Sequence, residues 1–275
     1  MCGRDGLQAA FAPVNRACSC QQRLLGFGIR SDEMRKYFSV YLVAVRSTAY
    51  KITGILLLMA AAETILFWIQ LKGAESGMPL SLEELVRISR IPLVSGAAFL
   101  AVCCILSLVG YEMSGSRTRY TIQRLSIKEE AVVWLWALNS MVALCIFWAA
   151  QLGIVLLLSK IYIDFLQPVS FNPQTIFLAF HRSEFLHSLL PLEETSRILR
   201  NVAMIFGLSI AAACFAQKQR QGQKGIALVV LTALTVVTFS GDMGKLGTDI
   251  VIIAAFLGAA AFSVYSIFRT EANKE

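Results

Sequence analysis

Charged residues are scarce in this sequence of 275 residues. Lys, Arg, Asp and Glu together make up 16% of the chain, whereas hydrophobic residues make up 56%. A soluble domain of this length can bury a full core with far less apolar content. Several apolar runs approach or exceed the roughly 20 residues that a helix needs to cross about 30 Å of hydrocarbon. The composition therefore argues against an ordinary soluble domain and predicts an all-α, polytopic membrane bundle.

Motifs for nucleotide hydrolysis and nucleophilic catalysis are absent. The pair Gly244-Lys245 lacks both the earlier spaced glycine and the following hydroxyl of a phosphate-binding loop. No Ser-His-Asp, Cys-His or paired-carboxylate constellation is apparent from the spacing. We therefore expect this chain to have no catalytic residues and to bind no cofactor directly.

Metal-ligating residues are too few and too scattered to predict a metal site. Cys18 and Cys20 lack a second pair of thiols and a nearby histidine, and the odd total of seven cysteines does not indicate a disulfide framework. His187 follows His181 by six residues, which is about 240° around a helix, so we expect the two rings to diverge. The apolar residues around them favour a segment that rests on the outer membrane surface or on the tops of the spans.

The N-terminal segment lacks the apolar core of a signal peptide, because Phe11 is followed closely by Pro13 and Arg16. We expect no cleavage. Residues 1–33 show no periodicity, whereas regular patterning starts at Met34. The segment 1–33 is expected to be a disordered tail or an extension that precedes the true initiator at Met34.

The transmembrane domain is predicted over residues 52–268. Segment 34–51 before it has apolar residues at helical spacing and basic residues around them, which is typical of an amphipathic helix lying in the membrane surface. Residues 269–275 form a polar tail. The six predicted spans are 52–71, 91–111, 131–159, 201–217, 225–240 and 248–268.

The distribution of Lys and Arg predicts the orientation of these spans. With the N-terminus inside, 17 of the 25 basic residues lie on the inner side and eight on the outer side. Without residues 1–33 the inner side still holds 13. Cytoplasmic loops carry the excess of Lys and Arg in membrane proteins. Both termini are therefore expected in the cytoplasm, and the net charge of +7 is interpreted as a topology signal, so that nucleic acid is not expected as a partner.

Three polar residues within the predicted spans form a candidate intramembrane polar site: Glu63, Asn139 and Gln151. An unpaired carboxylate in the bilayer costs on the order of 3 kcal/mol or more, so Glu63 must face protein or water. The residue is equally consistent with a substrate or proton site and with a carboxyl that hydrogen bonds to a neighbouring helix. The two amides are more simply explained as groups that hydrogen bond between helices.

Small residues recur at four-residue spacing in the last spans. Gly207 and Ala211 lie in the fourth span, and Ala255 and Ala259 lie in the sixth. Such residues allow helices to approach closely, either within one subunit or between copies.

The polar connection between the second and third spans, residues 112–130, is longer than a plain turn requires. It combines a cluster of charge with residues that could form an apolar patch, which favours docking to a cytoplasmic protein. A polybasic loop that binds lipid headgroups is the simpler alternative. The candidate docking residues are Arg117, Arg119, Tyr120, Arg124, Leu125, Lys128 and Glu129.

At this connection the sequence resembles the membrane subunits of type-two ABC exporters, and it is particularly similar to small permeases of gut-type Gram-positive bacteria that are encoded beside a separate ATPase. The resemblance covers about residues 34–268. It includes the amphipathic helix, the six spans, the run Arg117-x-Arg119-Tyr-Thr-Ile-Gln-Arg124-Leu-Ser-Ile and the motif Trp148-x-x-Gln151. This sequence departs from the family in its short link 241–247 between the fifth and sixth spans and in its enlarged connection between the third and fourth spans.

The resemblance implies a permease subunit in a bacterial cell membrane that exports or extracts a peptide, drug-like or lipid-like substrate. It also implies a second permease subunit, either identical or unlike, and a cytoplasmic ABC ATPase subunit that holds ATP and Mg²⁺ and docks on the connection 112–130. Two other classes remain as alternatives. An ion-coupled carrier or channel would act through Glu63 without an ATPase, and a membrane scaffold or sensor would transport nothing.

Overall fold

The computed structural model describes residues 12–74, 81–112, 129–166, 180–191, 194–220, 222, 225–240 and 246–272, and these contain helices and no strand. Five of the helices are long and apolar enough to cross a membrane: α1, α3, α5, α8 and α10. The described part of the chain is therefore all-helical, and its five long apolar helices indicate a membrane-embedded protein, as the composition predicts. The helices are α1 (Ala12–Ala74), α2 (Leu82–Ile88), α3 (Ile91–Glu112), α5 (Glu129–Leu166), α7 (Glu184–Leu189), α8 (Thr195–Arg220), α9 (Ala227–Ser240) and α10 (Leu246–Ala272).

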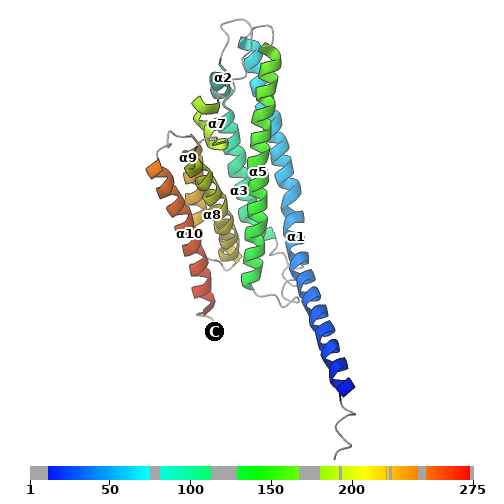
Figure 1. Ribbon diagram of the computed structural model, residues 1–275. Helices are drawn as coiled ribbons and strands as arrows, with labels where there is room; N and C mark the ends of the chain where they lie inside the picture. Colours follow the sequence, from blue (N-terminus) through cyan, green and yellow to red (C-terminus); the bar gives the residue numbers. More distant parts are fainter. Residues whose placement is uncertain are drawn as a thin grey trace, which may run out of the picture.

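The long helices stand side by side along one axis, and the short helices α2 and α7 lie at one end of them (Figure 1). We call this the capped end. The start of α5 and the end of α10 lie at the opposite end, which we call the terminal end, and α1 extends beyond it (Figure 1). Helices α1 and α5 run towards the capped end, and α3 and α10 run away from it. The C-terminal end of α10 and the N-terminal end of α1 therefore share one side of the bundle.

Residues 34–51 and 52–71 form one uninterrupted helix. Helix α1 continues without a break from Ala12 to Ala74, and its part that could span a membrane is Tyr37–Gly73. No glycine or proline occurs between residue 34 and Gly54, so nothing in the chain favours a break there. The structure thus differs from the predicted boundary at residue 51. It also gives helical backbone from Ala12 onward, where disorder was one expectation, while residues 1–11 lie outside the described part.

Three other helices extend past the predicted spans at their polar ends. Helix α5 continues to Leu166 instead of ending at 159, and α8 begins at Thr195 instead of 201. Helix α10 continues to Ala272, beyond the predicted limit at 268. Hydropathy marks how much of a helix lipid can cover, whereas backbone hydrogen bonding continues into the polar flanks.

Helix α9 is the exception among the six predicted spans. It has 14 residues and is therefore about 21 Å long at 1.5 Å per residue. The hydrocarbon of a typical bilayer is about 30 Å thick. By length, the described residues therefore hold five spanning helices and one shorter apolar helix, Ala227–Phe239.

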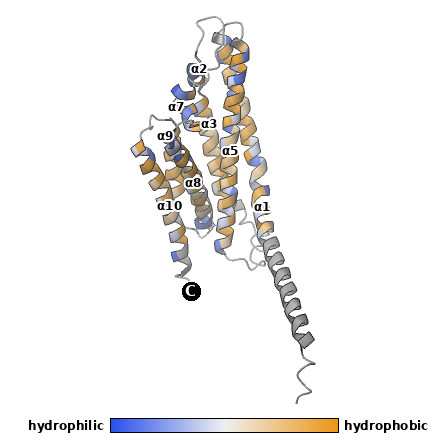
Figure 2. Cartoon of the chain, viewed as in Figure 1, coloured by the Kyte–Doolittle hydropathy of each residue, from blue (hydrophilic) through white to orange (hydrophobic). Residues whose placement is uncertain are grey.

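Helix α8 is the central element of the bundle and packs against α3, α5, α9 and α10. About two thirds of its most apolar stretch is buried, whereas no more than about a third of the corresponding stretch is buried in each of the other long spans. The exposed surfaces are largely apolar along the middle of α1, α5 and α10, and polar residues gather near the ends (Figure 2). Lipid can cover such surfaces, which agrees with a bundle that spans a membrane.

Helices α8 and α10 run parallel to each other. Arg200 of α8 contacts Asp249 of α10, and Gly207, seven residues further along α8, packs against Phe256, seven residues further along α10. An added Cβ at Gly207 would lie 3.0 Å from Phe256, so the small residue permits this close approach.

The capped end has an apolar core of its own. Leu85 of α2 and Leu186 of α7 are buried in one cluster with Phe67 of α1 and Leu158 of α5. Ser81 starts α2 by accepting a hydrogen bond from the N–H of Glu84 at 3.3 Å. The two short helices are thereby fixed over the ends of the long ones.

Candidate functional site

A buried polar pair joins α1 to α5. Nε2 of Gln151 donates to both carboxylate oxygens of Glu63, each at 3.1 Å. Glu63 is 0% exposed and Gln151 is 1% exposed. The two residues lie inside the apolar stretches Tyr37–Gly73 and Glu130–Phe165, where a polar group needs a partner because lipid offers none. The structure therefore brings together two of the three residues of the candidate polar site.

Asn139 lies elsewhere on the same helix interface. Its Nδ2 donates to Oγ1 of Thr48 at 3.4 Å, and Thr48 in turn donates to the carbonyl of Ala44 at 3.0 Å. Asn139 precedes Gln151 by twelve residues, which is about 18 Å along α5. It therefore belongs to a separate contact between α5 and α1 nearer the terminal end.

Gln151 also lines a partly open cavity of about 90 Å³ between the helices. The wall is formed by α3, α5, α7, α8 and α9, and most of it is apolar and aromatic, while the described lining includes no charged residue. Small-molecule sites share such a mostly apolar wall with a few polar groups, but they are usually larger, at about 300–1,000 Å³. The aromatic residues of the wall are Phe99, Phe147, Trp148, Phe185 and Phe239.

Three polar atoms of this wall are buried and have no hydrogen-bond partner within the described residues. They are Oε1 of Gln151, Oδ1 of Asn201 and Nε1 of Trp148. Both amides are held through their nitrogen atoms, since Gln151 donates to Glu63 and Nδ2 of Asn201 donates to the carbonyl of Ser188 at 2.8 Å. Each of these three atoms has almost no accessible surface, so none of them is open to the cavity.

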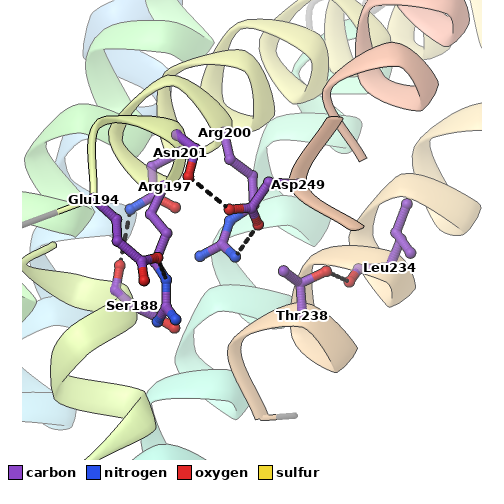
Figure 3. A network of polar contacts seen from close by, with 9 residues as sticks. Ser188, Glu194, Arg197, Arg200, Asn201, Leu234, Thr238 and Asp249 are labelled. Atoms are coloured by element: carbon purple, nitrogen blue, oxygen red, sulfur yellow. Dashed lines mark hydrogen bonds and ion pairs between the residues drawn. The ribbon is translucent and has the colours of Figure 1, made fainter. Parts of the chain in front are cut away.

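A buried ion pair joins the capped ends of α8 and α10. Nη1 of Arg200 donates to Oδ1 of Asp249 at 2.8 Å (Figure 3). Oγ of Ser196 donates to Oδ2 of Asp249 at 3.1 Å. Arg200 and Asp249 are each 1% exposed. Asp249 lies in the first turn of α10, where a helix N-terminus favours a negative charge. A second, more exposed ion pair, Arg197 with Glu194, lies close by (Figure 3).

Sequence reasoning missed this ion pair. Asp249 falls inside the predicted span 248–268 and Arg200 directly precedes the span 201–217. The available signal was the occurrence of opposite charges at the same end of two apolar segments. The topology argument uses Arg200 alone and leaves Asp249 aside, so neither residue is considered as the buried partner of the other.

The two histidines lie closer than predicted. The rings of His181 and His187 have centroids 5.5 Å apart at an interplanar angle of 85°. The prediction that they diverge is wrong because it assumed one continuous helix, whereas Ser183 between them has extended backbone and α7 begins only at Glu184. Within the described residues no group of three His, Cys, Asp or Glu could hold a metal ion.

The candidate docking residues 117–128 lie outside the described residues. Their flanks are described: α3 ends at Glu112 and α5 begins at Glu129. The start of α5 lies at the terminal end of the bundle, on the same side as the end of α10 (Figure 1). The connection 113–128 therefore enters α5 at the terminal end.

Comparisons with protein families, with curated proteins and with solved structures find no match. The fold itself defines the class: a helical membrane protein with five candidate spanning helices, a polar pair between α1 and α5, and a mostly apolar cavity between the helices.

Proposed function

We propose that this chain is the membrane-spanning permease subunit of an ABC-type transporter that exports or extracts a peptide, drug-like or lipid-like substrate. A separate ATPase subunit supplies ATP hydrolysis and holds ATP and Mg²⁺. The chain works with a second permease subunit in a bacterial cell membrane, with both termini in the cytoplasm. The observation that carries this proposal is the position of the basic connection 113–128 between two helices that also line the cavity.

The parallel arrangement of α8 and α10 supports six crossings. Because these helices run in the same direction, the chain must return from the terminal end to the capped end between them. Helix α9 lies in that return and is apolar, although its length of about 21 Å is short. Six crossings place both ends of the chain on one side, in agreement with the excess of Lys and Arg there.

In the proposed mechanism, α3 and α5 transmit movement of the docked ATPase to the cavity wall. Both helices flank the connection 113–128, and both line the cavity, α3 through Ser95 and Phe99 and α5 through Trp148 and Gln151. Helix α5 has 38 residues and is about 57 Å long. Movement of a docked ATPase would therefore pass along two rigid helices to the cavity wall. No residue of this chain takes part in hydrolysis.

The test is co-purification of the tagged chain with the products of neighbouring genes in mild detergent, followed by an ATPase assay. The double variant Arg119→Glu/Arg124→Glu reverses two charges of the connection and is expected to lose the ATPase. The matched control is Lys160→Glu/Arg182→Glu, which reverses two exposed charges near the capped end and should retain it. An ATPase that stays bound and fully coupled in the first variant would refute docking at this connection.

A second candidate is an ion-coupled carrier, and the fully buried carboxyl of Glu63 favours it. Intramembrane carboxylates often belong to ion or proton pathways. Glu63→Gln keeps the size and removes the ionisable group. Loss of transport in a chain that purifies without any ATPase would favour the carrier, whereas transport that survives this variant and depends on ATP would favour the permease. A membrane scaffold would show no substrate flux with either the wild-type chain or the Glu63→Gln variant.

A further inference from the structure

We propose that the cavity between α3, α5, α7, α8 and α9 holds a short stretch of one hydrocarbon chain of a membrane phospholipid, which reaches it from the surrounding lipid. Binding of this chain needs no ATPase and is independent of the proposed function. Its consequence for the substrate rests on that function: among the peptide, drug-like and lipid-like classes, the cavity favours a substrate with an apolar chain.

The surface that the cavity presents to a ligand is mostly apolar. Its described lining consists largely of aliphatic and aromatic residues and includes no charged residue. Gln151, Asn201 and Trp148 belong to this lining, but their unpartnered atoms Oε1, Oδ1 and Nε1 have almost no accessible surface. A bound molecule therefore gains no hydrogen bond from these three atoms. Uncharged hydrocarbon complements such a wall, because it has no polar group that would lose its hydration on burial.

Water is a poor occupant of this cavity. A buried water makes about three hydrogen bonds to protein atoms, and cavities with apolar walls stay dry. An empty cavity is also unfavourable, because the lining atoms then lack dispersion contacts on one side. The volume of about 90 Å³ is smaller than that of the engineered cavity of about 150 Å³ that accepts benzene. The cavity can therefore take a short stretch of a chain and not a whole lipid.

Part of the cavity rim lies at the outer surface of the bundle. Pro92 and Gly96 of α3 and Val236 of α9 line the cavity and are each partly exposed. Their neighbours Leu93 and Val237 are exposed and apolar, as expected for helix surfaces that face hydrocarbon. Lipid chains are the solvent at such a surface. Their high concentration there fills even a weak site.

Four side chains distinguish the cavity from its surroundings. Met204 and Leu208 of α8 are buried and line the cavity, so a lipid chain reaches them through it; we call them the reporter residues. Val102 of α3 is equally buried but does not line the cavity. Leu257 of α10 is exposed. A label on each position therefore identifies the cavity, the packed core and the outer surface, respectively.

The experiment is photolabelling of the full-length chain, purified without an ATPase, in nanodiscs of phosphatidylcholine that carries a diazirine in one acyl chain. Irradiation releases N₂ from the diazirine, and the resulting carbene inserts into neighbouring bonds of the protein. Peptide mass spectrometry then locates the label. We expect label on both reporter residues and on Leu257, and none on Val102.

Two glycines provide a matched pair of variants. Gly96 lines the cavity and Gly153 of α5 does not, and an added Cβ would meet nothing within 4 Å at either position. Gly96→Leu fills part of the cavity and should lower the label on the reporter residues several-fold. Gly153→Leu adds the same side chain on an exposed helix surface and should leave that label unchanged. Replacing glycine favours the helical backbone, so each variant should fold.

A third variant, Val236→Phe, obstructs the cavity from α9 and should also lower the label on the reporter residues. It keeps the test decisive if Gly96→Leu misfolds. In every variant, label that remains on Leu257 and remains absent from Val102 shows that the bundle is intact.

Label on Leu257 without label on the reporter residues would overturn the proposal and indicate a cavity that is empty or holds water. Reporter label that persists in both Gly96→Leu and Val236→Phe, or label on Val102 in the wild type, would also overturn it. None of these outcomes depends on the proposed function. Reporter label that is lost in Gly96→Leu, in a chain that co-purifies with no ATPase, would support the site and refute the ATPase-driven function.

Discussion

Removing one partner of the buried Arg200–Asp249 pair should destabilise the protein strongly. Nη1 of Arg200 lies 2.8 Å from Oδ1 of Asp249 and both residues are 1% exposed, so Asp249→Asn leaves a buried guanidinium without its counter-ion. Nε and Nη2 of Arg200 already lack partners within the described residues, so few other contacts could compensate. Breaking a buried ion pair from one side costs about 3–5 kcal/mol. We expect a loss of this size in the free energy of unfolding.

The double variant Arg200→Met/Asp249→Leu separates this cost from the value of the pair itself. Replacing both charges by apolar residues of similar size is often neutral or stabilising. The double variant should therefore be more stable than either single variant. The assay is unfolding by increasing mole fraction of sodium dodecyl sulfate, followed by circular dichroism. A loss below about 1 kcal/mol for Asp249→Asn, or a double variant less stable than both singles, would refute the reasoning.

Two further changes test contacts between the long helices. Gly207→Ala places a Cβ 3.0 Å from Phe256 and should lower the free energy of unfolding by about 1–3 kcal/mol. The control Gly258→Ala meets nothing within 4 Å and should be neutral or stabilising. Equal unfolding midpoints for the two variants in the same assay would contradict the packing argument. Gln151→Leu removes the amide that donates to Glu63 and should lower the free energy of unfolding by about 1–3 kcal/mol. Adding Glu63→Leu should restore much of this stability. No recovery in the double variant would show that the two side chains are not partners.

The sequence predicts the long helices well because lipid imposes a simple requirement on them. Every backbone polar group inside hydrocarbon must be satisfied within the helix, so a long uncharged apolar run has few alternatives. The ends of the helices are harder to predict. Residues 34–51 carry basic side chains and were separated from the first span on that account, yet backbone hydrogen bonding continues through them in α1. Charge changes which solvent a helix meets and need not end the helix.

The site residues were predictable as types and not as pairs. Glu63 and Gln151 stand out because each is polar inside an apolar run, but their contact depends on how α1 and α5 are rotated against each other. The same limit applies to the histidines, since a single extended residue at Ser183 changed the direction of the chain between them. The cavity has no sequence signal, because it depends on which side chains leave space between five helices.

The contacts between α8 and α10 together select one register. The facing surfaces of these helices are rich in small and apolar residues, and such surfaces could pack in several registers because lipid adds no directional preference. Arg200 meets Asp249 and Gly207 meets Phe256 with the same offset in sequence. A slip of one helical turn would separate the two charges inside the bundle and would bring a larger residue against Phe256. The ion pair, even where it adds little net stability, therefore fixes the position of α8, and with it the position of Asn201 in the cavity wall.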